Sequence, residues 1–375
     1  MDGTMQSADI RITPTGDAVV LVTAPIHSRA DALAVAPPFR TDVEPGERLG
    51  SEFVVVESSL PQLFSGTLTY DAPKPHCLEL SGTDEFLTRI STELNDQDVT
   101  CTEITLLFFD DGYGAVAVTY RIAGGWGRYG PDLKHFGRDS REDTCEQLRR
   151  LLLQALAPVY RELSEESSPG PQVPYFNMTY GGETDAHEPG RGHLAPGYRD
   201  LVYPNSPEPL RSMSPWRDQF FYAGYAYSLI FGNDTEGQVR KFSRLLMLLG
   251  ITYSRLARTS ASAKAALIQR RDHDVLWLQD LARWIRSSYQ DLVTPTFSFD
   301  FHALCLRDAI LRAWSLDVLH RSAEDLLLLV RATVEDRIAR SQARRSRWIN
   351  VALAVLTALS LISTIEAAVN LWNMP

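Results

Sequence analysis

An uncharged apolar run lies near the C-terminal end of the chain, from Trp348 to Ile365, and none of its 18 positions carries an ionisable side chain. At about 1.5 Å per residue, a helix over this run spans roughly 27 Å, close to the ~30 Å hydrocarbon core of a bilayer. The apolar pattern continues to Trp372, so that an indole ring marks each membrane interface. We therefore predict one transmembrane helix over residues 348–372, in preference to a buried core helix.

Five arginines precede this run and are called the arginine collar: Arg337, Arg340, Arg344, Arg345 and Arg347. On the other side of the run the charged residue is Glu366, which we expect at the far interface, where a carboxylate reaches water. Positive charge stays on the cytoplasmic side of a membrane helix. No secretory signal pattern opens the chain. The pattern thus predicts a tail-anchored, single-pass protein of the cell membrane with its N-terminal body in the cytoplasm.

Apolar residues of the preceding region recur at helical spacing. Residues 235–238 match a capping box, and steps of three and four residues then separate a set called the stalk seam: Val239, Phe242, Leu246, Leu249, Tyr253 and Leu256. A second helix continues the spacing at Leu278, Leu281, Ile285, Ser288 and Leu292. Because this is coiled-coil spacing, we predict a helical stalk over residues 233–347 that forms a homo-oligomer.

The last helix is predicted to begin near Phe301 and to run through the arginine collar into the membrane. No glycine or proline occurs between Ala303 and Trp372, so no residue of the breaking type separates stalk from span. Within the span, Ala354 and Ala358 form a small-xxx-small pair of the kind that lets membrane helices approach closely. This pair adds to the expectation of self-association.

Strands and two helices are predicted in the N-terminal region. The strand candidates are residues 19–22, 52–57, 66–70 and 220–231, together with a hairpin of residues 104–109 and 115–121. The helices are expected from Thr83 or Asp84 to Leu94 and from about Thr144 to Glu165. Their order predicts an α+β domain over residues 1–232 with a ferredoxin-like, split βαβ arrangement.

Residues 168–217 contain nine prolines and six glycines. This composition predicts an insertion without regular structure, either a lid or a disordered arm.

Charge and cysteine content narrow the function classes. The formal net charge is −10, of which residues 331–347 contribute +4 and Glu366 contributes −1, so residues 1–330 carry −13. Without a basic face outside the collar, we expect no nucleic-acid partner, whereas the collar is expected to attract a lipid bilayer. The four cysteines show no zinc spacing and indicate reduced cytosolic thiols.

No candidate constellation combines catalytic side chains at a suitable spacing. Residues 125–130 match G-x-G-x-x-G, but Pro131 and Gly137 follow where a dinucleotide-binding turn opens into a helix. Four possible metal ligands lie in the proline-rich and glycine-rich segment: Asp185, His187, Glu188 and His193. We interpret that group as a solvated loop. The sequence therefore predicts a protein that is not an enzyme, with no catalytic residue, cofactor or metal site.

The helical half resembles the stalk and first membrane helix of CorA-like magnesium transporters. The resemblance covers roughly residues 235–372 and rests on the leucine run at residues 326–330, the arginine collar and the span that continues them. It departs from that family because Asn373-Met374-Pro375 is not a Gly-Met-Asn signature and no second membrane helix follows.

The whole chain is similar to an actinobacterial family of CATRA conflict systems, which are named for their association with caspase-like peptidases and TPR proteins. The similarity is carried by the single terminal span and by residues 108–114 (FFDDGYG) and 221–228 (FYAGYAYS). It implies a membrane-associated component of an immunity or programmed-death module, with a caspase-like peptidase or TPR protein as partner.

These observations lead to one hypothesis and two alternatives. The hypothesis is a non-enzymatic membrane protein that acts as an oligomerising sensor, scaffold or membrane effector of a bacterial conflict system. The first alternative is a degenerate CorA-like channel or transporter for divalent cations. The second is an enzyme that uses residues 168–217 as a lid.

Overall fold

Strand β2 (Pro14–Ser28) is the long central strand of the protein, and its side chains alternate between two hydrophobic cores. Val20 and Val22 enter one core, while Val19 and Leu21 enter the other, as the two-residue period of a strand requires. The computed structural model describes residues 11–28, 43–57, 77–93, 98–109, 112–135, 144–163, 170–184, 193–202, 212–214, 219–224, 227–232, 234–268, 279, 283 and 301–372.

Ten strands of the described part of the chain form the main sheet. Its order is β11 (Gln219–Ala223), β12 (Tyr227–Gly232), β9 (Asn177–Thr184), β2, β7 (Gly114–Ile122), β6 (Val99–Phe109), β5 (Cys77–Gly82), β4 (Phe53–Val56) and β3 (Arg48–Leu49), with β8 (Pro171–Gln172) paired to β2. β12 and β9 are parallel, and the other neighbours are antiparallel. A separate parallel pair joins β1 (Arg11–Ile12) to β10 (His193–Leu194).

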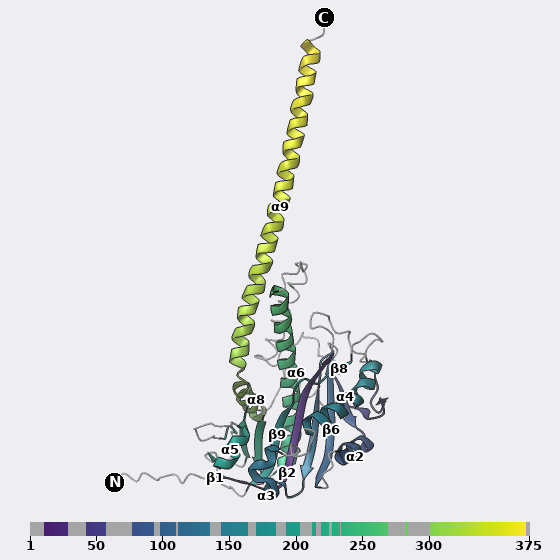
Figure 1. The fold of residues 1–375 in the computed structure, drawn as a ribbon, viewed down its shortest axis with the longest axis vertical. Helices are drawn as coiled ribbons and strands as arrows, with labels where there is room; N and C mark the ends of the chain where they lie inside the picture. The colour runs from purple at the N-terminus through teal and green to yellow at the C-terminus, as the bar shows by residue number, and fades with distance from the viewer. Residues whose placement is uncertain are drawn as a thin grey trace, which may run out of the picture.

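Helices cover both faces of the sheet (Figure 1). The first core packs against α2 (Asp84–Glu93), α3 (Gly125–Tyr129), η1 (Gly130–His135), α4 (Thr144–Leu163) and α5 (Pro196–Val202). The second core packs against α6 (Thr235–Ile268), α8 (Phe301–Ala313) and the first part of α9 (Leu316–Trp372). The mixed α/β class with a mostly helical C-terminal region is therefore confirmed.

The split βαβ arrangement is not confirmed. A βαβ unit joins two parallel strands through a helix that crosses over between them. Here α2 connects β5 and β6, which are antiparallel neighbours. α2 therefore lies in the connection between two adjacent antiparallel strands, and it is not a crossover between parallel strands.

Residues 168–217 are not an insertion without regular structure, because they supply the buried strand β9 between β12 and β2. Composition alone did not predict this strand because it contains Gly181 and Gly182, and glycine is uncommon in strands. A Cβ at Gly181 would lie 2.6 Å from Thr235 of α6, and one at Gly182 would lie 2.1 Å from the indole nitrogen of Trp126 of α3. Helices thus approach from both faces at positions where only hydrogen fits.

Two predicted elements are divided in the structure. The single strand predicted over residues 220–231 is a hairpin of β11 and β12, and the backbone N–H of Gly224 donates to the carbonyl of Tyr227 at its turn. The helix predicted to run unbroken from Phe301 ends at Ala313, and α9 begins at Leu316. Ser315 takes a positive φ of 52° at the junction, which a non-glycine residue rarely adopts.

Candidate membrane anchor

The first turns of α9 pack through apolar side chains against the body, which is the main sheet together with the helices from α2 to α8 that cover it. Ala323, Leu326, Val330 and Val334 are buried in the second core, which also contains α6. Just before α9, the ring of Trp314 packs edge-to-face on Tyr253, with 5.8 Å between the ring centroids. Because packing fixes this part of the helix, the direction of the rest of α9 is set by the body.

Val334 is the last buried residue along α9 among those whose side chains are described. The helix continues from there to Trp372 and extends far beyond the body (Figure 1). At about 1.5 Å per residue, Trp348 lies roughly 20 Å beyond Val334. Residues 335–347 are therefore a helical spacer between the body and the apolar run.

The arginine collar lies on this spacer. Arg340 pairs with Asp336 at 2.6 Å, one helical turn away. In the part of the chain that the structure describes, no acidic side chain pairs with Arg344, Arg345 or Arg347. The end of the spacer next to the apolar run is thus its most positively charged part.

The apolar run exposes its large side chains all around the helix. Each is at least 53% exposed: Trp348, Ile349, Val351, Leu353, Val355, Leu356, Leu359, Leu361, Ile362 and Ile365. Among the described residues, this is the one helix long and apolar enough to cross a membrane, and none of its most apolar part is buried in the chain. The helix is therefore compatible with single-pass membrane anchoring.

The other predicted residues of the span lie on the same helix. Ala354 and Ala358 are exposed, one helical turn apart. Glu366 and Trp372 belong to the last turns of α9, and their side chains lie outside the described residues.

The predicted stalk seam occupies a different place from the one expected. Val239, Phe242, Leu246, Leu249 and Leu256 are buried in the second core, and Tyr253 is partly buried against it. Phe242 packs edge-to-face on Phe221 of strand β11, with 4.9 Å between ring centroids. The residues therefore pack within one chain, and α6 is part of the body instead of a separate stalk. The second predicted seam, at Leu278, Leu281, Ile285, Ser288 and Leu292, lies outside the described residues.

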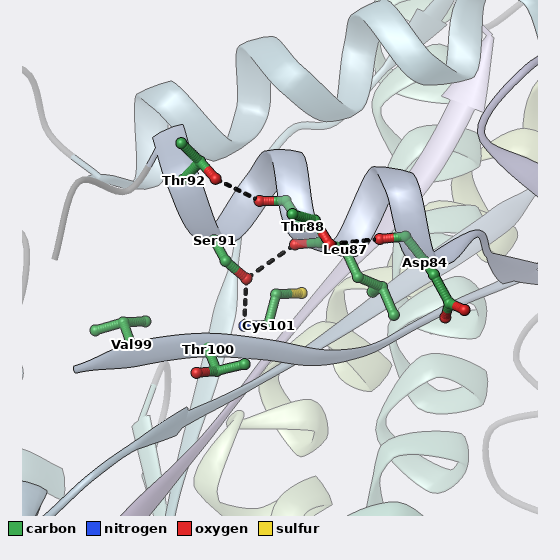
Figure 2. A pocket seen from close by; sticks show the side chains of 8 residues that line it. All are labelled: Asp84, Leu87, Thr88, Ser91, Thr92, Val99, Thr100 and Cys101. Carbon is green, nitrogen blue, oxygen red and sulfur yellow. Dashed lines mark hydrogen bonds between the residues drawn. The ribbon is translucent and has the colours of Figure 1, made fainter. Parts of the chain in front are cut away.

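A hollow of about 520 Å³ opens between α2 and the start of β6 (Figure 2). It is lined by Asp84, Leu87, Thr88, Ser91, Thr92, Val99, Thr100 and Cys101. Most of its hydroxyl groups already have partners, because those of Thr88, Ser91 and Thr92 donate to backbone carbonyls one helical turn earlier.

Burial determines the protonation state of the Cys101 thiol, which lines this hollow. Desolvation raises the pKa of Cys101 to about 12, so the thiol is protonated at neutral pH. The backbone N–H of Cys101 donates to the hydroxyl of Ser91 at 2.8 Å, which ties α2 to β6. The Ser91 hydroxyl therefore links the helix to the sheet, whereas the hydroxyls of Thr88 and Thr92 bond within α2.

Of the remaining candidate groups, the glycine-rich motif lies in the described part of the chain. Gly125 to Tyr129 form the short helix α3, whose Trp126 is buried and donates its indole N–H to the carbonyl of Gly181. The strand predicted over residues 66–70 and the ligands Asp185, His187 and Glu188 lie outside the described residues. Among the described residues, no three His, Cys, Asp or Glu side chains come together as metal ligands. No family model, curated protein or solved structure matches the chain.

Proposed function

We propose that this protein is a membrane-anchored, non-enzymatic component of a bacterial conflict or immunity module, in which α9 holds an α/β sensing or docking body at the cytoplasmic face of the cell membrane. One observation carries the proposal. A single helix is buried against the body at one end and exposes a continuous apolar surface at the other.

The exposed apolar side chains of α9 favour a lipid environment over water. Removing a large apolar side chain from water contributes about 1.5–3 kcal/mol. The apolar run exposes ten such side chains and makes no core of its own within the described chain. A bilayer supplies the missing apolar surroundings, and the backbone polar groups of a helix are already paired for that environment.

The arginine collar supports the proposed orientation. Its arginines immediately precede the apolar run, and cationic residues next to a membrane helix remain on the cytoplasmic side. They also attract the anionic lipids of that leaflet. The body, with −13 on residues 1–330, is repelled by the same surface, and the spacer keeps it at a distance.

The conflict-system context rests on the sequence resemblance of residues 108–114 and 221–228. In the fold these segments lie at the β6–β7 turn and in the β11–β12 hairpin, although residues 110, 111, 225 and 226 are outside the described parts. The resemblance suggests a caspase-like peptidase or TPR protein as the partner that docks on the body.

Fractionation of expressing cells tests the proposal. We expect full-length protein to stay in the membrane pellet after alkaline extraction, and a chain stopped after Arg347 to be soluble and folded. Fusing an unrelated Leu/Ala membrane helix to the truncated chain should restore pelleting. Full-length protein in the soluble fraction without detergent would contradict the anchor, and Mg²⁺ uptake by vesicles that contain the protein would favour transport instead.

A further inference from the structure

Among the described residues, one face of α9 has no packing partner, although it begins with a large apolar side chain at the level of the body. Leu326 and Val330 are buried, but Leu328 between them is 65% exposed. At about 100° per residue, Leu328 lies about 160° around the helix from both of them. A helix that packs on one side needs no leucine on the opposite side.

This face continues along the helix as a straight stripe, called the outer stripe. Its members are Leu328, Ala332, Glu335, Ala339, Gln342, Ser346, Asn350, Leu353, Thr357, Ser360 and Thr364. The steps of three and four residues between them average 3.6, the period of an undistorted α-helix. The outer stripe therefore lies on one side of α9 from the body to the apolar run.

Within the spacer, the outer stripe avoids the arginine collar. All five collar arginines lie at least about 80° around the helix from Ala339. The one acidic member of the stripe, Glu335, accepts a hydrogen bond from Arg331 of its own helix at 2.8 Å. A second helix could thus approach this side of the spacer without placing the collar arginines of the two helices against each other.

Within the apolar run, the same stripe collects the polar side chains. Apart from the indole of Trp348, five residues from 348 to 365 carry polar side chains, and four of them lie on the stripe: Asn350, Thr357, Ser360 and Thr364. Thr357 and Thr364 donate to carbonyls of their own helix. Within the described residues, the Asn350 amide and the Ser360 hydroxyl have no hydrogen-bond partner. Small and polar residues are the ones through which membrane helices associate.

We infer that the outer stripe is the surface on which α9 of a second copy of this chain packs, parallel and at the same height. The inference rests on the proposed anchoring, because two copies in one membrane with one orientation bring the same residues to the same depth. Leu328 then packs on Leu328 beside the bodies, Ala339 and Ser346 allow close contact along the spacer, and polar groups pair in the span. Each body stays on the far side of its own helix.

Cysteine cross-linking in membranes tests this surface. Ala339→Cys lies on the stripe, while Ser341→Cys is a matched control on the same exposed spacer, about 160° around the helix. With a short bis-maleimide, we expect Ala339→Cys to give a product of twice the mass at roughly five-fold or greater yield than Ser341→Cys. The wild type, with its four native cysteines, is the blank.

A second variant tests the contribution of the span. Asn350→Leu should lower the cross-linked yield of Ala339→Cys by roughly three- to ten-fold, whereas Val351→Leu should leave it unchanged. Each sample is also fractionated, which distinguishes a failure of the inferred helix contact from a failure of the proposed membrane anchoring. If the chains are in the membrane but the Ala339→Cys and Ser341→Cys variants cross-link equally, or not at all, the inference is overturned and anchoring stays intact. Chains absent from the membrane overturn both.

Discussion

Arg244 of α6 pairs with Glu79 of β5, and the guanidinium lies 3.1 Å from the carboxylate. The Glu79 side chain is only 4% exposed, whereas Arg244 is 40% exposed. One turn earlier on the same helix, Arg240 lies 3.1 Å from Glu103 of β6, and both of these side chains are more exposed. α6 is therefore attached to neighbouring strands by one partly buried and one exposed ion pair.

Arg244→Leu is expected to destabilise the protein by about 1–3 kcal/mol, because it removes a charged hydrogen-bond donor from the buried carboxylate of Glu79. Arg240→Leu is the matched control and should cost no more than about 1 kcal/mol. Chemical denaturation followed by circular dichroism measures both. Equal losses for the two variants would mean that burial of Glu79 does not matter.

Leu246→Ala and Leu328→Ala are expected to separate folding from self-association. Leu246 is 3% exposed in the core, so its truncation should cost about 2–5 kcal/mol. Leu328 is 65% exposed, so its truncation should change stability by no more than about 0.5 kcal/mol while lowering the cross-linked yield in membranes. An unchanged melting temperature for Leu246→Ala would contradict burial of Leu246 and would mean that this residue lies on an exposed helix face.

Asp17 is expected to contribute a pH-dependent part of the stability. The N–H of Gly124 and the guanidinium of Arg121 donate to its carboxylate, and both hydrogen bonds lower the pKa of Asp17. A lowered pKa in the folded state gives stability that is present above the unfolded pKa and is lost as the pH falls through the folded one. Both groups are partly exposed, so the contribution is at most about 1 kcal/mol.

The measurement for Asp17 is thermal unfolding at pH 7 and pH 3. Asp17→Asn should melt lower than the wild type at pH 7, and the difference should shrink at pH 3. Asp132→Asn changes an exposed acid in η1 and is the control. A difference that grows toward low pH would contradict the sign of the pKa shift.

Local sequence patterns correctly predicted a hairpin and two helices. The hairpin predicted over residues 104–109 and 115–121 is present as β6 and β7, and the helix predicted from Thr144 is α4. α2 also begins as predicted, since the hydroxyl of Thr83 accepts a hydrogen bond from the N–H of Phe86.

Elements determined by tertiary contact were missed. β9 contains Gly181 and Gly182 because helices press on it from both sides, which no local pattern reveals. The break between α8 and α9 is made by Ser315 in the left-handed region, after Trp314 has packed into the core, and no glycine or proline marks it.

The candidate membrane anchor was likewise predicted in part from the sequence. The length and lack of charge of residues 348–365 identified the helix that the structure leaves exposed. The spacing of Val239, Phe242 and Leu246 identified a buried helix face but not the surface that buries it, because a sheet and a second helix require the same apolar spacing. The outer stripe was missed because it becomes apparent only when the body-facing side of α9 is known.

The orientation prediction concerns the collar. Trypsin added to intact spheroplasts should leave the body uncut, whereas inside-out vesicles should release it by cleavage at exposed arginines such as Arg344 and Arg345. The physical reason is retention of positive charge on the cytoplasmic side. Cleavage in spheroplasts with intact membranes would reverse the proposed orientation.

The depth of α9 in a bilayer shows directly whether this helix spans the membrane. Spin labels would be placed at Ser341 in the spacer and at Leu356 in the middle of the apolar run, in full-length chains without native cysteines, reconstituted in lipid vesicles. If α9 spans the membrane, the label at Leu356 collides often with oxygen and rarely with a water-soluble nickel complex, and the label at Ser341 shows the reverse. A label at Leu356 that is as accessible to the nickel complex as the label at Ser341 would contradict a membrane-spanning α9.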